Sequence, residues 1–220
     1  MRLALLLAAL VAVSAPRAQV AVDFNVGPTV AWTEDVSAFT FDPADPGAAL
    51  RRDSLVVPAT VGVQGGLGLT MRAGGLGIRV GGQFLNTTAL YDGEERLNRQ
   101  ALDTSFLTLQ LDLQFAQRVG PASVYVFGGP EARYLLDLSG DVAGLDDLRE
   151  GAELLSAAAN LGGGVRLNLF GTRVGPEVRY AFDLTGVSGQ DVALGDGSTF
   201  RFDEAFDIDT LLVGLVIGGI

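Results

Sequence analysis

The chain has 220 residues, of which 48% are hydrophobic and 19% are charged, and it contains neither cysteine nor histidine. These two absences exclude disulfides, thiolate nucleophiles, cysteine- or histidine-ligated metals and the Ser-His-Asp triad. A formal net charge of −11 argues against nucleic-acid binding, which needs clustered positive charge. We therefore expect no catalytic residue, no cofactor, no metal site and no nucleic-acid partner.

The first 18 residues read as a targeting segment. Met1 and Arg2 precede an apolar stretch over 3–13, and small residues lead up to a predicted cleavage site after Ala18. This order is typical of a secretory signal peptide, and the apolar stretch is too short for a membrane helix. The sequence predicts a signal peptide over 1–18 and a single exported domain over 19–220.

After residue 18 the dominant hydrophobic period is two, which is the period of a β-strand with one apolar face. Over 107–115, for example, leucine and phenylalanine occupy the odd positions, while threonine, glutamine and aspartate occupy the even ones. The last segment is apolar on both faces, which leaves its register open. The pattern predicts eight strands, over 20–32, 55–72, 76–88, 104–118, 123–137, 156–170, 173–185 and 205–220.

The connections between these segments alternate in length. Long connections rich in aspartate, glycine and serine cover 33–54, 89–103, 138–155 and 186–204, whereas 73–75, 119–122 and 171–172 are tight turns. Outer-membrane barrels show this asymmetry, with short turns on the periplasmic side and long loops outside. The fold prediction is therefore all-β: an eight-stranded antiparallel up-and-down transmembrane β-barrel.

Two hairpins resemble a known family. The segment 119–136, Val-Gly-Pro-Ala-Ser-Val-Tyr-Val-Phe-Gly-Gly-Pro-Glu-Ala-Arg-Tyr-Leu-Leu, is similar to the central hairpin of PorT-like outer-membrane β-barrel proteins. The run 161–169 and the segment 176–187, with its Arg179-Tyr180 pair, resemble the hairpin that follows in that family. The resemblance covers roughly 115–187 well and implies a small barrel in the bacterial outer membrane.

An eight-stranded barrel encloses a lumen just wide enough for its side chains to fill. Enclosed charges are costly unless they are paired, so we expect a lumen closed by ion pairs. If Gly171 and Thr172 form a two-residue turn, Arg166 lies opposite Glu177 and Asn160 opposite Asp183, which predicts an Arg166–Glu177 ion pair. The predicted lumen network consists of Asp112, Glu131, Arg133, Arg166, Glu177, Arg179 and Asp183. The other residues predicted to point inward are Asp23, Asn25, Gln64, Arg79, Gln83, Gln110, Gln114 and Asn168.

Two further patterns concern the ends of the barrel. Trp32, Phe84, Tyr91, Tyr134 and Tyr180 lie near strand ends or at outward positions, which is typical of an interfacial aromatic girdle. Acidic residues over 191–209 carry oxygen ligands, but they lack the spacing of a calcium-binding loop, so they are interpreted as a solvated surface.

Three functional hypotheses remain at this point. The first is an outer-membrane protein with a filled lumen, surrounded by outer-membrane lipid, whose acidic loops serve a structural or interaction role with an extracellular or periplasmic protein. The second is a narrow pore for ions or small solutes. The third is a secreted soluble barrel that binds a small apolar ligand.

Overall fold

A computed structural model of the chain describes residues 19–33, 36–41, 51–55, 60–91, 100–140, 154–185, 192–193, 199–202 and 208–218. The predicted signal peptide over 1–18 lies outside these ranges. Within them the chain forms strands and turns. No helix in the described part of the chain is long and apolar enough to cross a membrane.

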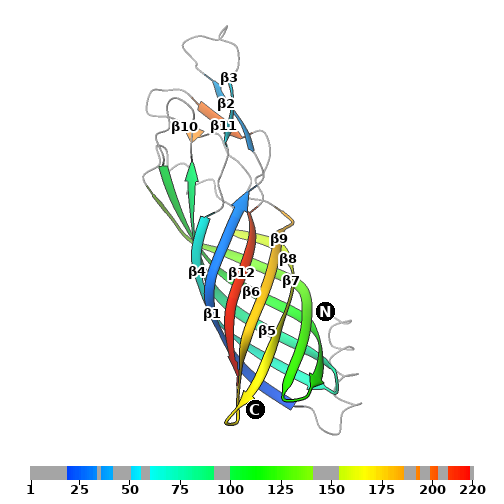
Figure 1. The fold of residues 1–220 in the computed structure, drawn as a ribbon. Coiled ribbons are helices and arrows are strands. Elements are labelled where there is room, and N and C mark those ends of the chain that lie inside the picture. Colours follow the sequence, from blue (N-terminus) through cyan, green and yellow to red (C-terminus); the bar gives the residue numbers. More distant parts are fainter. Residues whose placement is uncertain are drawn as a thin grey trace, which may run out of the picture.

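Eight antiparallel strands close into a barrel in the order β1-β12-β9-β8-β7-β6-β5-β4 (Figure 1). Each barrel strand pairs with the barrel strands before and after it in the sequence, and the first, β1, pairs with the last, β12, to close the ring. The predicted up-and-down barrel is therefore confirmed. The strands are β1 (Gln19–Thr33), β4 (Thr60–Ala73), β5 (Leu76–Tyr91), β6 (Gln100–Val119), β7 (Ala122–Gly140), β8 (Leu155–Leu169), β9 (Thr172–Asp183) and β12 (Ile208–Gly218).

The two faces of the barrel wall differ in polarity along most of the strands. On β6, Leu109 is 59% exposed on the outside, whereas the next residue, Gln110, is 2% exposed inside the barrel. Successive side chains of a strand point to opposite faces, so the period of two in the sequence becomes an apolar exterior and a polar interior. Arg133 and Arg179 are buried, and Val126 and Val178 are exposed, as this orientation requires.

Three tight turns join strands at one end of the barrel, which we call the turn-side end; the opposite end is the loop-side end. The turns are Gly74-Gly75, Gly120-Pro121 and Phe170-Gly171. The third turn corrects the prediction of Gly171-Thr172, because Leu169 pairs with Thr172. Phe170 and Gly171 both have positive φ, at 53° and 87°, the combination that a type I′ hairpin turn requires.

A β-bulge interrupts the pairing of β6 with β7 near the loop-side end. Ser105 pairs with Asp137, but Phe106 pairs with Leu135, so Leu136 is the extra residue. The bulge shifts the alternation by one position and leaves both Leu136 and Asp137 exposed. The sequence pattern, which places these two residues on opposite faces, is wrong at this point.

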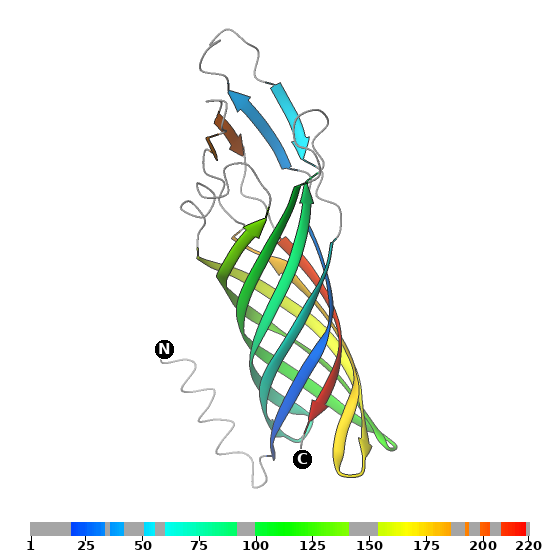
Figure 2. The same cartoon turned by 90° about the vertical axis from the view of Figure 1, so that its left-hand side faces the viewer.

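A second sheet is built from two of the connections that were predicted as loops. It has the order β10-β11-β2-β3, with β2 (Val36–Phe41), β3 (Arg51–Leu55), β10 (Val192–Ala193) and β11 (Thr199–Phe202). Figures 1 and 2 show it beyond the loop-side end of the barrel. Pairing of β2 with β11 joins segments far apart in the sequence, and the local pattern of a long polar connection cannot reveal such a contact.

Candidate functional site

The interior of the barrel is the site that the sequence singles out, and it is mostly polar. All seven residues of the predicted network are buried there. Of the other residues predicted to point inward, seven are also buried, namely Asp23, Asn25, Gln64, Arg79, Gln83, Gln110 and Gln114. The exception is Asn168, which is exposed because the β8–β9 hairpin extends past the pairing of β8 with β7, which begins at Ala122 and Leu167.

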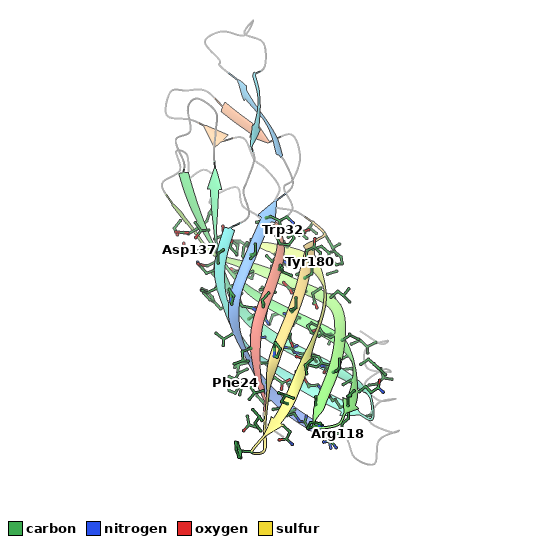
Figure 3. All side chains as sticks on the ribbon, viewed as in Figure 1. Phe24, Trp32, Arg118, Asp137 and Tyr180 are labelled. Atoms are coloured by element: carbon green, nitrogen blue, oxygen red, sulfur yellow. The ribbon has the colours of Figure 1, made fainter. Side chains whose placement is uncertain are left out.

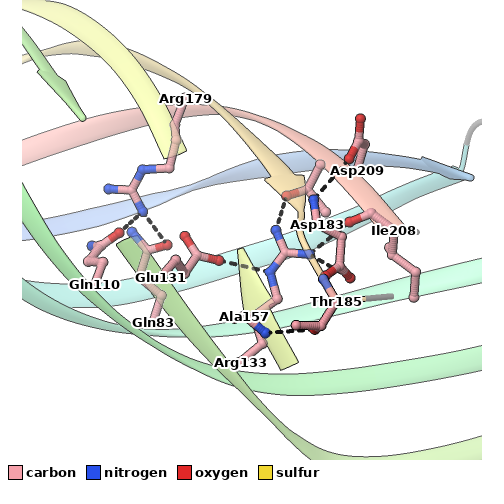
Figure 4. A network of polar contacts seen from close by, with 11 residues as sticks. Gln83, Gln110, Glu131, Arg133, Ala157, Arg179, Asp183, Thr185, Ile208 and Asp209 are labelled. Carbon is pink, nitrogen blue, oxygen red and sulfur yellow. Dashed lines mark hydrogen bonds and ion pairs between the residues drawn. The ribbon is translucent and has the colours of Figure 1, made fainter. Parts of the chain in front are cut away.

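The loop-side part of the interior is organised around Arg133 (Figure 4). Its Nε donates to Glu131 Oε1 at 2.9 Å, Nη1 donates to the carbonyl oxygen of Ile208 at 2.7 Å, and Nη2 donates to Thr210 Oγ1 at 3.2 Å. Asp183 Oδ2 lies 3.9 Å from Nη1. All three guanidinium nitrogens of Arg133 are therefore bonded, and two carboxylates balance its charge.

The central part of the interior is organised around Glu177. Arg79 Nη1 and the Tyr125 hydroxyl both donate to its Oε2 at 2.8 Å, and Arg179 Nη2 lies 3.6 Å from its Oε1. Arg179 Nη1 also donates to the side-chain oxygens of Gln83 and Gln110 (Figure 4). Two buried arginines thus share one glutamate, which connects strands β5, β6, β7 and β9.

The turn-side part corrects the predicted pairing. Arg166 points inward as expected, but its partner is Asp23 on β1, with Nη2 2.9 Å from Oδ2. Glu177 lies opposite Gly164, and Asn160 lies opposite Ala181. The predicted Arg166–Glu177 and Asn160–Asp183 pairs are wrong because the hairpin turn lies one residue earlier than assumed, which moves every register partner by two.

Two aromatic rings, which the sequence analysis did not place in the lumen, fill its centre. Tyr125 and Phe127 are buried and stack with their centroids 6.1 Å apart. Arg166 lies 4.4 Å from the Tyr125 centroid, and Arg79 and Arg179 each lie 5.2 Å from that of Phe127. Guanidinium groups over ring faces are favourable when desolvated. The period of two did place both residues on the inward face and could have found them.

The glycine run over 162–164 makes room for these rings. A Cβ on Gly164 would come within 2.6 Å of the Tyr125 hydroxyl oxygen, and one on Gly162 would collide with the ring of Phe127. Close packing of aromatic rings against the backbone of β8 is what the structure has.

The interior leaves little free volume. Arg79, Arg133, Arg166 and Arg179 are among its largest fully buried side chains. A cavity of about 10 Å³, room for roughly one water molecule, lies against Asn25, Gln64 and Arg179. A small apolar cluster of Leu85, Phe106 and Leu212 completes the packing. Nowhere in the described ranges do three acidic residues gather as metal ligands.

The outer surface carries an aromatic group near the loop-side end (Figure 3). Trp32 stacks on Tyr180 with their centroids 5.7 Å apart, and Phe182 lies 5.9 Å from Tyr180. The Tyr180 hydroxyl donates to Asp209. Phe84 and Tyr134 are also exposed on the outside, whereas the side chain of Tyr91 lies outside the described part. Of the acidic residues over 191–209, Asp209 alone lies in the described ranges.

No protein-family model matches the sequence, and no curated protein sequence does either. Among solved structures the chain is similar to neisserial surface protein A (NspA), at 11% identity and a TM-score of 0.42, covering 88% of this chain and 96% of that one. Ail, the attachment invasion locus protein of Yersinia pestis, matches at 10% identity with a TM-score of 0.37, covering 91% and 99%. The outer membrane protease OmpT from Escherichia coli matches at 8% identity with a TM-score of 0.35, covering 93% and 97%.

Proposed function

We propose that the chain is an integral protein of the bacterial outer membrane with a closed lumen and a non-enzymatic, structural or interaction role. The observation that carries the proposal is the inverted wall of the barrel. Large aliphatic and aromatic residues are exposed on all eight strands, while most of the charged residues between the two ends of the barrel are buried inside it. Soluble proteins rarely expose apolar patches of more than a few hundred Å².

A lipid bilayer accounts for both faces at once. Hydrocarbon is a suitable surrounding for the exposed valine, leucine and phenylalanine side chains, and a closed barrel leaves no unpaired strand edge in it. The aromatic group of Trp32, Tyr180 and Phe182 has the composition and position of an interfacial girdle. A secreted soluble barrel with an apolar ligand would need an apolar lumen, and this lumen is lined by arginine, glutamine and carboxylate groups.

The packing of the lumen favours a closed barrel over a pore. Arg79, Arg166 and Arg179 cross the interior to partners on other strands, and their guanidinium groups lie over the rings of Tyr125 and Phe127. The cavity beside Arg179 has room for about one water molecule. Glu131, Glu177 and Asp183 are ion-paired with arginines, so they are poor candidates for acid–base catalysis.

The proposed interaction surface is the loop-side end, which carries the long acidic connections and the second sheet. We propose an extracellular or periplasmic protein as its partner and outer-membrane lipid as its surroundings. Membership of the PorT-like family remains a prediction that depends on the residues of 115–187.

Cell fractionation tests the membrane assignment. The protein should sediment with outer membranes, require detergent for extraction, and migrate faster on gels when unheated, because a closed barrel resists unfolding by the gel detergent at room temperature. Recovery from the aqueous periplasmic fraction without detergent, with no shift in mobility on heating, would contradict it.

Planar-bilayer recording tests the closed lumen independently. We expect no steady single-channel conductance from the purified protein at moderate voltages. A stable open conductance would replace the closed lumen by the narrow pore, while leaving the membrane assignment intact.

A further inference from the structure

The turn-side mouth of the lumen carries an excess of positive charge. Arg72 at the end of β4, Arg166 on β8 and Arg173 at the start of β9 all have the inward parity of their strands. Asp23 is the one carboxylate that the described residues place beside them: it pairs with Gly218, which in turn pairs with Arg173. Gly218 contributes no side chain, so nothing on β12 separates Asp23 from Arg173.

The single carboxylate is engaged through one oxygen, Oδ2, while its Oδ1 has no hydrogen-bond partner among the described residues. Arg166 Nη2 lies 2.9 Å from Asp23 Oδ2, and the Thr70 hydroxyl donates to the same oxygen at 3.1 Å. Asp23 can therefore balance one arginine, and about two positive charges remain uncompensated among the described residues of the mouth. Arg72 is close enough to Arg166 and Arg173 to be repelled electrostatically by both, and it is attracted by Asp23. This repulsion is unfavourable unless an anion relieves it.

The same arginines hold N–H donors without acceptors. Arg72 Nη2 donates to Gln114 Oε1 at 3.0 Å, but Arg72 Nε has no acceptor among the described residues. Arg166 is 1% exposed, and its Nε and Nη1 are likewise without acceptors there. Arg133, at the other end of the lumen, has all three nitrogens bonded, whereas Arg79 and Arg179 in the central part each have an unpaired Nε and Nη2 but lie beside Glu177. Leaving a buried charged donor unsatisfied is costly. Asp23 Oδ1 is also unpaired, but Arg72 Nε, Arg166 Nε and Arg166 Nη1 outnumber it, so the mouth has more unpaired donors than acceptors as well as an excess of positive charge.

We propose that the turn-side mouth binds a phosphate-type oxyanion through Arg72, Arg166 and Arg173. Such an anion supplies the two features that the mouth lacks: about two negative charges and several acceptor oxygens that match the planar fork of guanidinium donors. Arg72 and Arg173 are half-buried and open to the turn-side end, so a ligand can reach them, while Arg166 lies deeper. A free phosphate and a phospholipid headgroup share this chemistry. The site goes beyond the proposed function and does not depend on it.

Calorimetric titration of inorganic phosphate into the purified protein, held in uncharged maltoside micelles, tests the site. We expect saturable binding of about one phosphate per chain, weakened by sulfate through competition and by rising sodium chloride through screening. Heat-modifiable gel mobility and the fluorescence of Trp32, the single tryptophan, check that each preparation is folded.

Variants distinguish a specific phosphate site from general electrostatic attraction of anions. Arg72→Gln and Arg173→Gln should each weaken the phosphate affinity about tenfold or more, because each removes one charge-assisted contact. Arg118→Gln is the matched control: Arg118 also has inward parity, but it lies on the part of β6 beyond the pairing with β5 and is exposed at the same end (Figure 3), and its loss changes the net charge equally. We expect the control to change the affinity about twofold at most. Equal binding by the wild type and an Arg72→Gln/Arg173→Gln double variant would overturn the proposal.

A second arm identifies the source of the anion. Mixed micelles containing either phosphatidylglycerol or uncharged diacylglycerol are compared by native mass spectrometry and by competition with inorganic phosphate. Retention of phosphatidylglycerol that depends on Arg72 and Arg173 supports a lipid headgroup, and saturable binding of inorganic phosphate without lipid retention supports a free anion. Failure of both probes to bind would overturn the site.

Discussion

The inner and outer faces of the barrel wall belong to the same strands, but they are stabilised in different ways. Outside, neighbouring residues such as Leu107, Leu109 and Leu111 are interchangeable aliphatic groups, each about half exposed. Inside, the arginines and Glu177 have particular partners: Arg133 bonds to Glu131, Ile208 and Thr210 and lies beside Asp183, and Glu177 binds Arg79 and Tyr125. The stability of the outer face therefore depends on the medium around the barrel, and that of the inner face depends on particular ion pairs and hydrogen bonds. Substitutions on the two faces should therefore change the free energy of unfolding by different amounts.

The largest effect is expected from breaking an inner ion pair. Arg133→Met leaves Glu131 and Asp183 buried without their cation, which should lower the free energy of unfolding by about 3–5 kcal/mol. Urea titration of the protein folded into phospholipid vesicles, monitored by Trp32 fluorescence, measures it. Arg118→Met, on an exposed arginine, should change stability by about 0.5 kcal/mol at most. A similar loss of unfolding free energy in both variants would mean that the buried ion pairs of Arg133 do not stabilise the barrel more than an exposed arginine does.

The next effect tests the outer face. Leu109→Arg places a charge in the middle of the apolar exterior and should cost about 2–4 kcal/mol in a bilayer. Gln117→Arg, on the outward face of the same strand nearer the turn-side end, is the control and should cost about 0–1 kcal/mol. The same vesicle titration applies. If Leu109→Arg were harmless in vesicles, the outside of the barrel would not face hydrocarbon.

A smaller difference separates two glycines that face opposite sides. Gly164→Ala should destabilise by about 1–3 kcal/mol, because the added Cβ meets the Tyr125 hydroxyl and the carbonyl oxygen of Pro176. At Gly82, on the outside of β5, the nearest atom to an added Cβ is a leucine methyl carbon at 3.6 Å, so Gly82→Ala should be tolerated. Denaturant midpoints of the two variants give the comparison. If Gly82→Ala were the more destabilising variant, the ring of Tyr125 would not pack against Gly164.

The smallest effect, a gain, is expected at the β8–β9 turn. Phe170 adopts a positive φ that asparagine accepts more readily, and Asn-Gly is the preferred pair for a type I′ turn. Phe170→Asn should therefore raise the free energy of unfolding by about 0.5–1 kcal/mol. The fully exposed ring makes no compensating contact within the described chain that would offset this gain. A measurable loss of stability would instead assign the ring a contact with lipid or with another protein.

Most of the barrel could be predicted from local pattern. The alternation over 107–115 fixes which side chains share a face, because the period of a strand is two whatever its neighbours are. The short glycine turns at 74–75 and 120–121 mark hairpins in the same local way. Eight strands and the burial of Arg133, Arg166 and Arg179 followed from these features, and the structure agrees with them. The predicted faces agree as well, except at the Leu136 bulge and at the exposed Asn168.

The tertiary structure alone decided which inner groups meet. A turn placed one residue earlier changed the partner of Arg166 from Glu177 to Asp23, which lies on a strand 143 positions away in the sequence (166 − 23). The Leu136 bulge and the pairing of β2 with β11 are likewise absent from any local period. The physical reason is that alternation assigns a side chain to a face whatever the register between strands is. An ion pair across the lumen, in contrast, depends on the register of every pair of strands between its two partners.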